Sequence, residues 1–467
     1  MEEKTIVEQL SEELTYSPKH ACRLVEESEV ATADSFCEGY KEFLNICKTE
    51  RECVRYIVDA AKEKGFTEYD YDKKYSAGDK VYRINRDKSV ILAVFGKKPC
   101  KDGVRIAAAH IDSPRIDLKP SPLYEDEEMA LFKTHYYGGI KKYQWTAIPL
   151  SLHGVIFKAD GSRVDVNIGE KDDEPKFVIT DLLPHLGEEQ MKRTLAGGIT
   201  GEELNIVVGS RPLTNDKGGD LVKLNILKLL NEKYGITEKD FVSAELEIVP
   251  SMPVSDIGFD RSLIGGYGHD DRVCAYPAAM AAFDADSPEY TCISVLTDKE
   301  ETGSDGNTGL QSSYLKYFIE DIAKAEGSEG YRVLSKSSCL SADVNAAFDP
   351  TFSSVYEKKN TSFVNRGIVV TKYTGARGKA GTSDASAEFM SFVRNVFDSA
   401  DVVWQHGELG KVDAGGGGTV AKYIANLDVD VVDVGVPVLS MHSPYEVVSK
   451  LDVYMAYKGF KAYFEHK

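Results

Sequence analysis

The first part of the chain carries a helical pattern of apolar residues that gives way to strands. Apolar residues recur at intervals of three and four over residues 1 to about 70, as in FCEGYKEFLNICKTERECVRYIVDAAKEKGF, which is typical of amphipathic helices. Gly65 is a residue at which the last of these helices can end. Two short apolar runs bounded by turn residues follow, SVILAVFG (89–96) and VRIAAAHID (104–112), and they predict buried strands.

The pattern changes between about 121 and 250. LSLHGVIFKADGSRVDVNIG predicts strands around an Asp-Gly turn at 160–161. LTNDKGGDLVKLNILKLLNEKYGI predicts a loop and then a helix, and AELEIVPSM predicts a returning strand. Because this block differs from both flanks, we interpret it as an inserted subdomain. Residues 1–120 and 251–467 would then form one discontinuous domain.

After residue 255 apolar strands alternate with helices. The predicted strands are YTCISVLTDKEE (290–301), SSCLSADV (337–344) and VVDVGVPVLSMH (431–442). The predicted helices cover 270–283, 310–327, 383–397 and 449–466. Such alternation predicts an α/β fold with a doubly wound, mostly parallel sheet that is covered by helices on both faces.

Length, composition and charge narrow the classes of protein. A chain of 467 residues with 42% hydrophobic residues is long enough for a large domain with an insertion. The formal charge of -19 argues against nucleic acids and anionic membranes as partners, because both attract positive charge. No segment reaches the roughly 18 consecutive apolar residues that a membrane helix needs.

Two further features point to the cytoplasm as the expected location. The N-terminal sequence MEEKTIVEQLSEEL is acidic and amphipathic, and it has neither the basic start nor the apolar run of a secretory signal. The eight cysteines form no CxxC pair, so we expect reduced core residues rather than a zinc knuckle.

Side chains that can bind metals or move protons stand at the ends of four predicted strands. In open α/β sheets, ligands bind outside the carboxyl ends of the strands. Each residue alone has an ordinary structural interpretation, such as a hydrogen-bonded histidine, an exposed turn or a helix cap. Their common position is the stronger observation. The residues are His110 and Asp112, Glu300 and Glu301, Asp343, and His442, with Asp270 or Asp271 of GHDDRV at the start of a predicted helix.

The types of these residues suit metal-dependent hydrolysis. Such a reaction needs one carboxylate that binds the ion and another that takes the proton of water, and the adjacent Glu300 and Glu301 can divide these roles. Asp112, two residues after His110, can accept the other ring N–H of that histidine. The ligands are imidazoles and carboxylates, which suit zinc and also cobalt or manganese. Five ligands are too many for one catalytic zinc and fit two ions that share a carboxylate.

Five blocks, in this order and spacing, resemble the aspartyl aminopeptidase / aminopeptidase I family of dinuclear zinc exopeptidases. The blocks are AAHIDSPRIDLKP (108–120), GYGHDDRVCAYPA (266–278), TDKEETGS (297–304), SADVNAAFDP (341–350) and VPVLSMHSPYE (436–446), and the resemblance covers nearly the whole length. It implies a zinc-exopeptidase core interrupted by a β-rich dimerisation subdomain. It also implies peptide substrates and assembly as dodecamers built from dimers.

The resemblance also assigns roles to residues of this chain. Asp270 matches the carboxylate that bridges both ions, His110 and Asp343 match the other ligands of one ion, and Glu301 and His442 match those of the second. Two divalent ions per subunit are therefore expected, zinc first, with cobalt or manganese as alternatives.

Three further residues match the catalytic machinery of that family. Glu300 matches the general base, and Asp112 matches the aspartate that orients the first histidine. The family completes its active site with a histidine from the inserted domain of a neighbouring subunit, and His185 in DLLPHLGEE is the best match here.

The residues that would contact the substrate depart from the aspartate-preferring members. TKYTGARGKAGTSDA (371–385) offers Lys372, Arg377 and Lys379 as basic candidates. A run of four glycines follows later, in which Gly415 and Gly416 would let the backbone approach a substrate unless the run is a flexible loop. An acidic first residue and a leucine-like or broad preference therefore both stay open.

The function expected from the sequence is removal of N-terminal residues from peptides by a dinuclear metalloaminopeptidase. One alternative is another dinuclear hydrolase on the same core, a carboxypeptidase or deacylase, which would cleave N-blocked substrates. The other is a non-catalytic assembled scaffold, against which the complete ligand set and the intact Glu300 argue.

Overall fold

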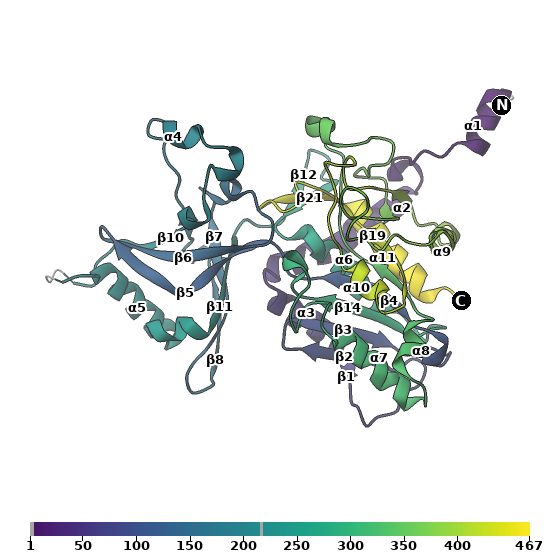
Figure 1. Cartoon of the computed structure of the whole chain (residues 1–467), viewed down its shortest axis with the longest axis horizontal. Helices are drawn as coiled ribbons and strands as arrows, with labels where there is room; N and C mark the ends of the chain where they lie inside the picture. Colours follow the sequence, from purple (N-terminus) through teal and green to yellow (C-terminus); the bar gives the residue numbers. More distant parts are fainter. Residues whose placement is uncertain (1–3, 215–217) are drawn as a thin grey trace.

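The computed structural model describes residues 4–214 and 218–467, which form two units (Figure 1). Part of the loop predicted before the helix in LTNDKGGDLVKLNILKLLNEKYGI, residues 215–217, lies outside the described residues, as do residues 1–3 of the predicted helical start. One unit is a nine-stranded sheet between layers of helices, and the other is a β-rich unit beside it. Among the described residues, no helix is both long and apolar enough to cross a membrane.

The nine-stranded sheet is mixed, with a parallel centre. Its four central strands β14, β4, β15 and β19 all run parallel. The strands β3 and β17, which flank this centre, run antiparallel to it. In spatial order the strands are β1 (Thr67–Glu68), β2 (Lys80–Asn85), β3 (Ser89–Val94), β14 (Cys292–Thr297), β4 (Arg105–His110), β15 (Ser338–Ser341), β19 (Asp430–Gly435), β17 (Ile368–Thr371) and β18 (Trp404–His406).

Helices cover both faces of this sheet because the central strands are apolar on both sides. Every residue of β4 is buried; Ala107 and Ala109 pack into one core, whereas Ile106 and Ala108 pack into the other. The doubly wound α/β fold predicted from the sequence is confirmed. The first face is covered by α2 (Glu27–Ile46), α3 (Glu50–Glu63), α6 (His269–Asp284), α9 (Ala387–Ser399) and α11 (Lys450–Glu465), and the second by α7 (Tyr314–Ala325), α8 (Gly330–Leu334) and α10 (Ala421–Ala425).

The second unit is a seven-stranded sheet in which all neighbours are antiparallel. Its first strand begins at Arg115 and so crosses the boundary that the sequence suggested at residue 121. The helix α5 (Leu221–Tyr234) packs against the sheet. In spatial order the strands are β8 (Arg163–Ile168), β7 (Leu150–Phe157), β11 (Ala244–Pro250), β5 (Arg115–Asp126), β6 (Met129–Tyr137), β10 (Ile206–Gly209) and β9 (Val178–Ile179).

The single strand predicted over 431–442 is wrong. The chain leaves the nine-stranded sheet after Gly435 and continues as β20 (Pro437–Leu439) in a separate small sheet. Proline has no N–H to donate to a ladder, so a strand of one sheet is readily interrupted there. The small sheet has the order β12 (Ser255–Ile257), β13 (Leu263–Gly266), β21 (Glu446–Ser449), β20 and β16 (Asn345–Ala346).

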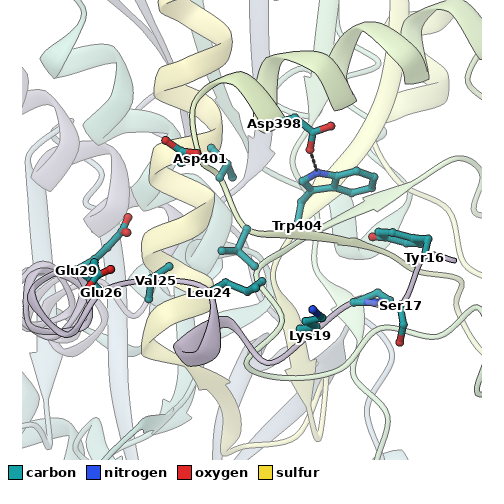
Figure 2. Close-up of a pocket in the computed structure, with 13 residues that line it drawn as sticks. Tyr16, Ser17, Lys19, Leu24, Val25, Glu26, Glu29, Asp398, Asp401 and Trp404 are labelled. Atoms are coloured by element: carbon teal, nitrogen blue, oxygen red, sulfur yellow. Dashed lines mark hydrogen bonds between the residues drawn. The ribbon is translucent and has the colours of Figure 1, made fainter. Parts of the chain in front are cut away.

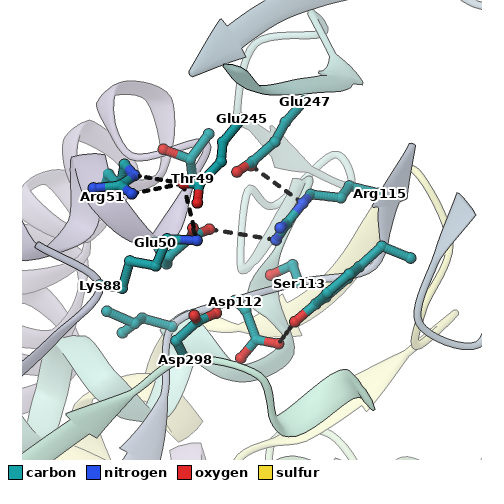
Figure 3. A network of polar contacts seen from close by, with 12 residues as sticks. Thr49, Glu50, Arg51, Lys88, Asp112, Ser113, Arg115, Glu245, Glu247 and Asp298 are labelled. Atoms are coloured by element: carbon teal, nitrogen blue, oxygen red, sulfur yellow. Dashed lines mark hydrogen bonds and ion pairs between the residues drawn. The ribbon is translucent and has the colours of Figure 1, made fainter. Parts of the chain in front are cut away.

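Buried charges join the two units (Figure 3). The guanidinium of Arg115 on β5 lies 3.3 Å from Glu50 Oε2, at the start of α3, and 3.3 Å from Glu247 Oε2 on β11. Lys88 Nζ lies 3.3 Å from Glu50 Oε1. Because a buried ion is stable only when it is paired, this network favours one arrangement of the two units.

A buried histidine forms a second polar connection, which we call the His153 bridge. His153 Nδ1 lies 2.8 Å from Glu52 Oε1 on α3, and its Nε2 lies 2.9 Å from Glu170 Oε1. Burial lowers the pKa of His153, but hydrogen bonds to Glu170 and Glu52 outweigh burial and raise the pKa to about 9. The ring is therefore a cation between two carboxylates near neutral pH.

The N-terminal segment packs on the body only after its first helix. The helix α1 (Ile6–Leu14) buries none of its residues and projects from the body in Figure 1. Beyond it, Tyr16 stacks on Trp404, whose indole N–H donates to Asp398 across 2.8 Å. Figure 2 shows these residues around a surface cavity of 560 Å³. All cysteines except Cys22 are buried, in agreement with their prediction as core residues.

Candidate active site

Parallel strands bring the predicted metal-binding side chains to one edge of the nine-stranded sheet. His110 is the last residue of β4, Asp343 follows β15, and the short helix η7 (Glu300–Thr302) follows β14. Because these three strands are neighbours and run parallel, their carboxyl ends coincide. Asp270 reaches the same place from the start of α6, and His442 does so from the turn after β20.

Asp270 lies at the centre of the cluster. Its Oδ1 is 3.2 Å from His110 Nε2, and its Oδ2 is 3.1 Å from His442 Nε2. Asp343 Oδ1 lies 3.9 Å from His110 Nε2, and Glu301 Oε1 lies 3.6 Å from His442 Nε2. The cluster thus contains three groups with metal-ligand spacing: His110, Asp270 and Asp343; Asp270, Glu301 and His442; and His110, Glu300 and Glu301.

The structure distinguishes Asp270 from Asp271, which the residue pattern alone left open and the family resemblance decided in favour of Asp270. The Oδ2 of Asp271 accepts the backbone N–H of His110 across 3.3 Å, so this carboxylate faces the backbone rather than the two imidazoles. Both aspartates have non-helical backbone angles, and α6 becomes regular only after them. This irregular start directs the two adjacent carboxylates to different partners.

Sequence reasoning missed Glu446, which supports the same cluster. Its carboxylate is buried and accepts the backbone N–H of Asp270 at 3.1 Å and that of His442 at 2.7 Å. It therefore ties the start of α6 to the turn after β20. The signal was its place in VPVLSMHSPYE, four residues after His442.

Asp112 contacts the ring of His110 as expected, although β4 already ends at His110. The ring Nδ1 of His110 lies 3.0 Å from the backbone oxygen of Asp112 and 3.3 Å from its Oδ1. The carboxylate of Asp112 also accepts the backbone N–H groups of Glu300 and Glu301. A proton held at Nδ1 by these acceptors leaves Nε2 of His110 free to bind a cation.

The two adjacent glutamates differ in exposure. The side chain of Glu300 is 18% exposed and opens on the pocket, with Oε2 4.0 Å from His110 Nε2. Burial raises the pKa of Glu300 to about 7, and the charge of His110 opposes this rise. The side chain of Glu301 is 3% exposed, and its buried Oε1 has no hydrogen-bond donor among the residues that the structure describes. A buried carboxylate oxygen without a donor fits a metal ligand, as does the cluster's set of nitrogen and oxygen donors.

The pocket in front of the cluster has a volume of 490 Å³ and contains only one of the five predicted substrate contacts. Gly416 lines it, together with Thr374, Lys422 and Tyr423. A Cβ at Gly416 would lie 2.0 Å from the oxygen of Gly375, so this glycine is required by close backbone packing.

The other four candidates lie outside this pocket. Arg377, Lys379 and Gly415 line a smaller adjoining hollow. Lys372 and Lys379 both pair with Asp384. Lys422, which the sequence did not single out, is the lysine that lines the pocket beside the cluster, and the structure gives it no ion pair among the described residues.

His185 lies on the inserted unit and is not among the residues that line the pocket of its own chain. It is exposed in a turn just before the short helix α4 (Glu188–Met191). In Figure 1 this helix lies at the tip of the second unit.

A buried cluster of histidines and carboxylates at the carboxyl edge of an α/β sheet, with a glutamate that opens on a pocket, defines a metal-dependent hydrolase. Residues 43–464 match the family model described as Aminopeptidase I zinc metalloprotease (M18). The chain belongs to the M18 family of zinc aminopeptidases, and it removes N-terminal residues from peptides. The family resemblance predicted from the five sequence blocks is confirmed.

Relatives match over nearly their whole length. The chain is 47% identical over 434 residues to the probable M18 family aminopeptidase 1 of Clostridium acetobutylicum. The alignment covers 91% of this chain and 93% of the relative. The crystal structure of an M18 family aminopeptidase from Thermotoga maritima has a TM-score of 0.93 at 43% identity, covering 97% of this chain and all of the other. That of aminopeptidase I from C. acetobutylicum has a TM-score of 0.91 at 43% identity, with the same coverage.

Proposed function

We propose that each subunit binds two divalent ions, zinc in the first place, which share Asp270. His110 and Asp343 would complete the ligands of one ion, and Glu301 and His442 those of the other. The observation that carries this proposal is that the two oxygens of Asp270 face two different imidazoles, at 3.2 and 3.1 Å. Cobalt or manganese would accept the same nitrogen and oxygen donors.

The residues around the cluster have separate roles in this proposal. Zinc held by these ligands would supply a Lewis acid that polarises a carbonyl and lowers the pKa of water. Glu300 takes the proton of the attacking water and delivers it to the leaving amine, which its partial exposure and its position at the pocket support. Asp112 holds the proton of His110 at Nδ1, so that Nε2 stays directed at the cluster.

The proposed substrates are peptides with a free α-amine and an acidic or neutral first residue. Lys422 lines the pocket and would attract an acidic side chain, whereas Arg377 and Lys379 lie in the adjoining hollow. Gly415 and Gly416 border these spaces with backbone alone, which leaves room for a peptide.

We also propose a homo-oligomer built from dimers, of the dodecamer type. The solved structure of mApe1 from S. cerevisiae, 20% identical to this chain, is a dodecamer. In such an assembly the exposed His185 of one subunit would complete the active site of a neighbour. Light scattering of wild-type protein, and activity recovered by mixing His185→Ala subunits with Glu300→Gln subunits, would test both parts.

The main test joins metal counting with a substrate panel. Mass spectrometry should find two zinc ions per subunit in wild type and a loss of one in Asp343→Asn or in His442→Gln. Aminoacyl peptides with a free amine should be cleaved, and their N-acetylated counterparts should not. Cleavage of the blocked peptides alone would favour a carboxypeptidase or deacylase. Protein that neither holds metal nor gains activity from zinc, cobalt or manganese would favour a scaffold.

A further inference from the structure

A short segment of the inserted unit reaches the metal cluster within the same chain. It consists of Tyr137, the last residue of β6, together with Gly138 and Gly139, and we call it the β6 strap. The strap contacts the surroundings of both histidines of the cluster. Since β6 belongs to the seven-stranded sheet, these contacts connect the inserted unit directly to the site.

The first contact runs through Asp112. The hydroxyl of Tyr137 donates to Asp112 Oδ2 across 2.8 Å. The guanidinium of Arg115 lies over the Tyr137 ring, 4.0 Å from its centre, and holds the ring in place. Asp112 is fully buried and its Oδ1 lies 3.3 Å from His110 Nδ1, so the orientation of this carboxylate is transmitted to His110.

The second contact is made by the backbone. The carbonyl oxygen of Gly139 lies 2.8 Å from Nδ1 of His442, and an oxygen there requires a proton on Nδ1. The Nε2 of His442, which faces Asp270 and Glu301, is then the free nitrogen.

The middle residue of the strap must be small. Gly138 has φ +74°, and a Cβ there would lie 3.2 Å from Glu301 Oε2. The strap therefore passes close to Glu301 on its way between the two histidine contacts.

We propose that the β6 strap positions both histidines for metal binding, Tyr137 through Asp112 and Gly139 through its carbonyl. The inserted unit then supports metal affinity in its own chain, in addition to any role in assembly. This inference rests on the proposed ligand set. Partners that orient metal ligands typically change metal affinity or activity by about 10- to 100-fold when they are removed.

The test removes the Tyr137 hydroxyl and compares it with a neighbouring one. Tyr137→Phe keeps the ring, and the matched control is Tyr136→Phe on the same strand, where the side chain is 40% exposed. Zinc affinity is measured on apoprotein by competition with a chromophoric chelator. Tyr137→Phe should bind zinc about 10- to 100-fold more weakly and lose kcat, with KM little changed, whereas Tyr136→Phe should match wild type.

A double variant separates positioning from a general structural effect. If Tyr137 acts through Asp112, then Tyr137→Phe combined with Asp112→Asn should bind zinc no more weakly than Asp112→Asn alone. Additive losses, a zinc affinity of Tyr137→Phe within twofold of wild type, or an equal loss in Tyr136→Phe would each overturn the inference. Wild-type protein that binds no zinc would instead refute the proposed ligand set. The zinc affinity of wild type therefore distinguishes that failure from a failure of the strap inference.

Discussion

Replacing Glu300 with glutamine tests the proposed base most directly. Glutamine keeps the shape of the side chain but cannot take a proton at neutral pH. Glu300 opens on the pocket, and its Oε2 lies 4.0 Å from His110 Nε2, so the change leaves the contacts of Asp270 with both histidines intact. Loss of a general base typically costs about 10²–10⁴ in rate, which corresponds to about 3–5 kcal/mol in the barrier. We therefore expect kcat to fall by that factor while zinc content stays at the wild-type value.

The adjacent Glu301 supplies the matched control, because Glu301→Gln changes the same charge one residue away. Its buried Oε1 has no hydrogen-bond donor in the described part of the chain, so we expect this variant to lose zinc as well as activity. The assay combines steady-state cleavage of an aminoacyl fluorogenic peptide with zinc measured by mass spectrometry on the same samples. A Glu300→Gln enzyme with full zinc and near-normal kcat would refute the base assignment. A loss of zinc in Glu300→Gln equal to that in Glu301→Gln would show that the two roles are not divided as proposed.

Three further predictions concern specificity, packing and pH. Lys422→Met should lower kcat/KM for peptides with an acidic first residue by about 10- to 100-fold relative to leucine peptides. The reason is that a hydrogen bond to a charged group contributes about 1.5–3 kcal/mol. An unchanged ratio of the two kcat/KM values would exclude this lysine from specificity. Gly435→Ala places a Cβ 1.7 Å from the backbone oxygen of Asp343. This variant should therefore hold less zinc, and its free energy of unfolding in denaturant should fall by about 1–3 kcal/mol. Gly378→Ala, where the space around the Cβ is open, should show neither effect. The His153 bridge should stabilise the fold fully below about pH 6.5 and lose its contribution, up to about 3 kcal/mol, as pH rises through about 9. Denaturant unfolding of wild type at a series of pH values should show this loss of stability. In His153→Gln the free energy of unfolding should change less with pH over the same range.

The sheet that carries the site was predictable because its strands are apolar on both faces. A run such as VRIAAAHID has no polar face to expose, and only a strand between two helical layers buries it completely. The same logic placed His110, Asp343 and the glutamate pair at one edge of the sheet, since parallel strands present their carboxyl ends together. The local pattern of apolar residues therefore identified the fold class and the metal-binding residue types at this edge of the sheet.

The limits of local pattern appear where the chain changes direction or sheet. Pro437 interrupts what reads as one apolar strand, and β20 joins another sheet, so the path that delivers His442 could not be derived from periodicity. Lys372 reads as a pocket cation, yet it pairs with Asp384, whereas Lys422 lines the pocket. Which of several lysines faces a pocket depends on loop conformation, which carries no periodic signal.

The sequence by itself determined the α/β class, the residue types of the metal site and, through five spaced blocks, the family. The residue pattern left Asp270 and Asp271 open, and the family resemblance assigned the bridge to Asp270, which in the structure faces both histidines. Only the tertiary structure decided that Tyr137 and Gly139 of the inserted sheet reach the same site. The physical reason is the separation along the chain over which each kind of interaction acts. Burial and periodicity act over a few neighbouring residues and leave a trace in the sequence, whereas hydrogen bonds between Asp112 and Tyr137, or His442 and Gly139, join segments whose approach is set by the packing of two whole units.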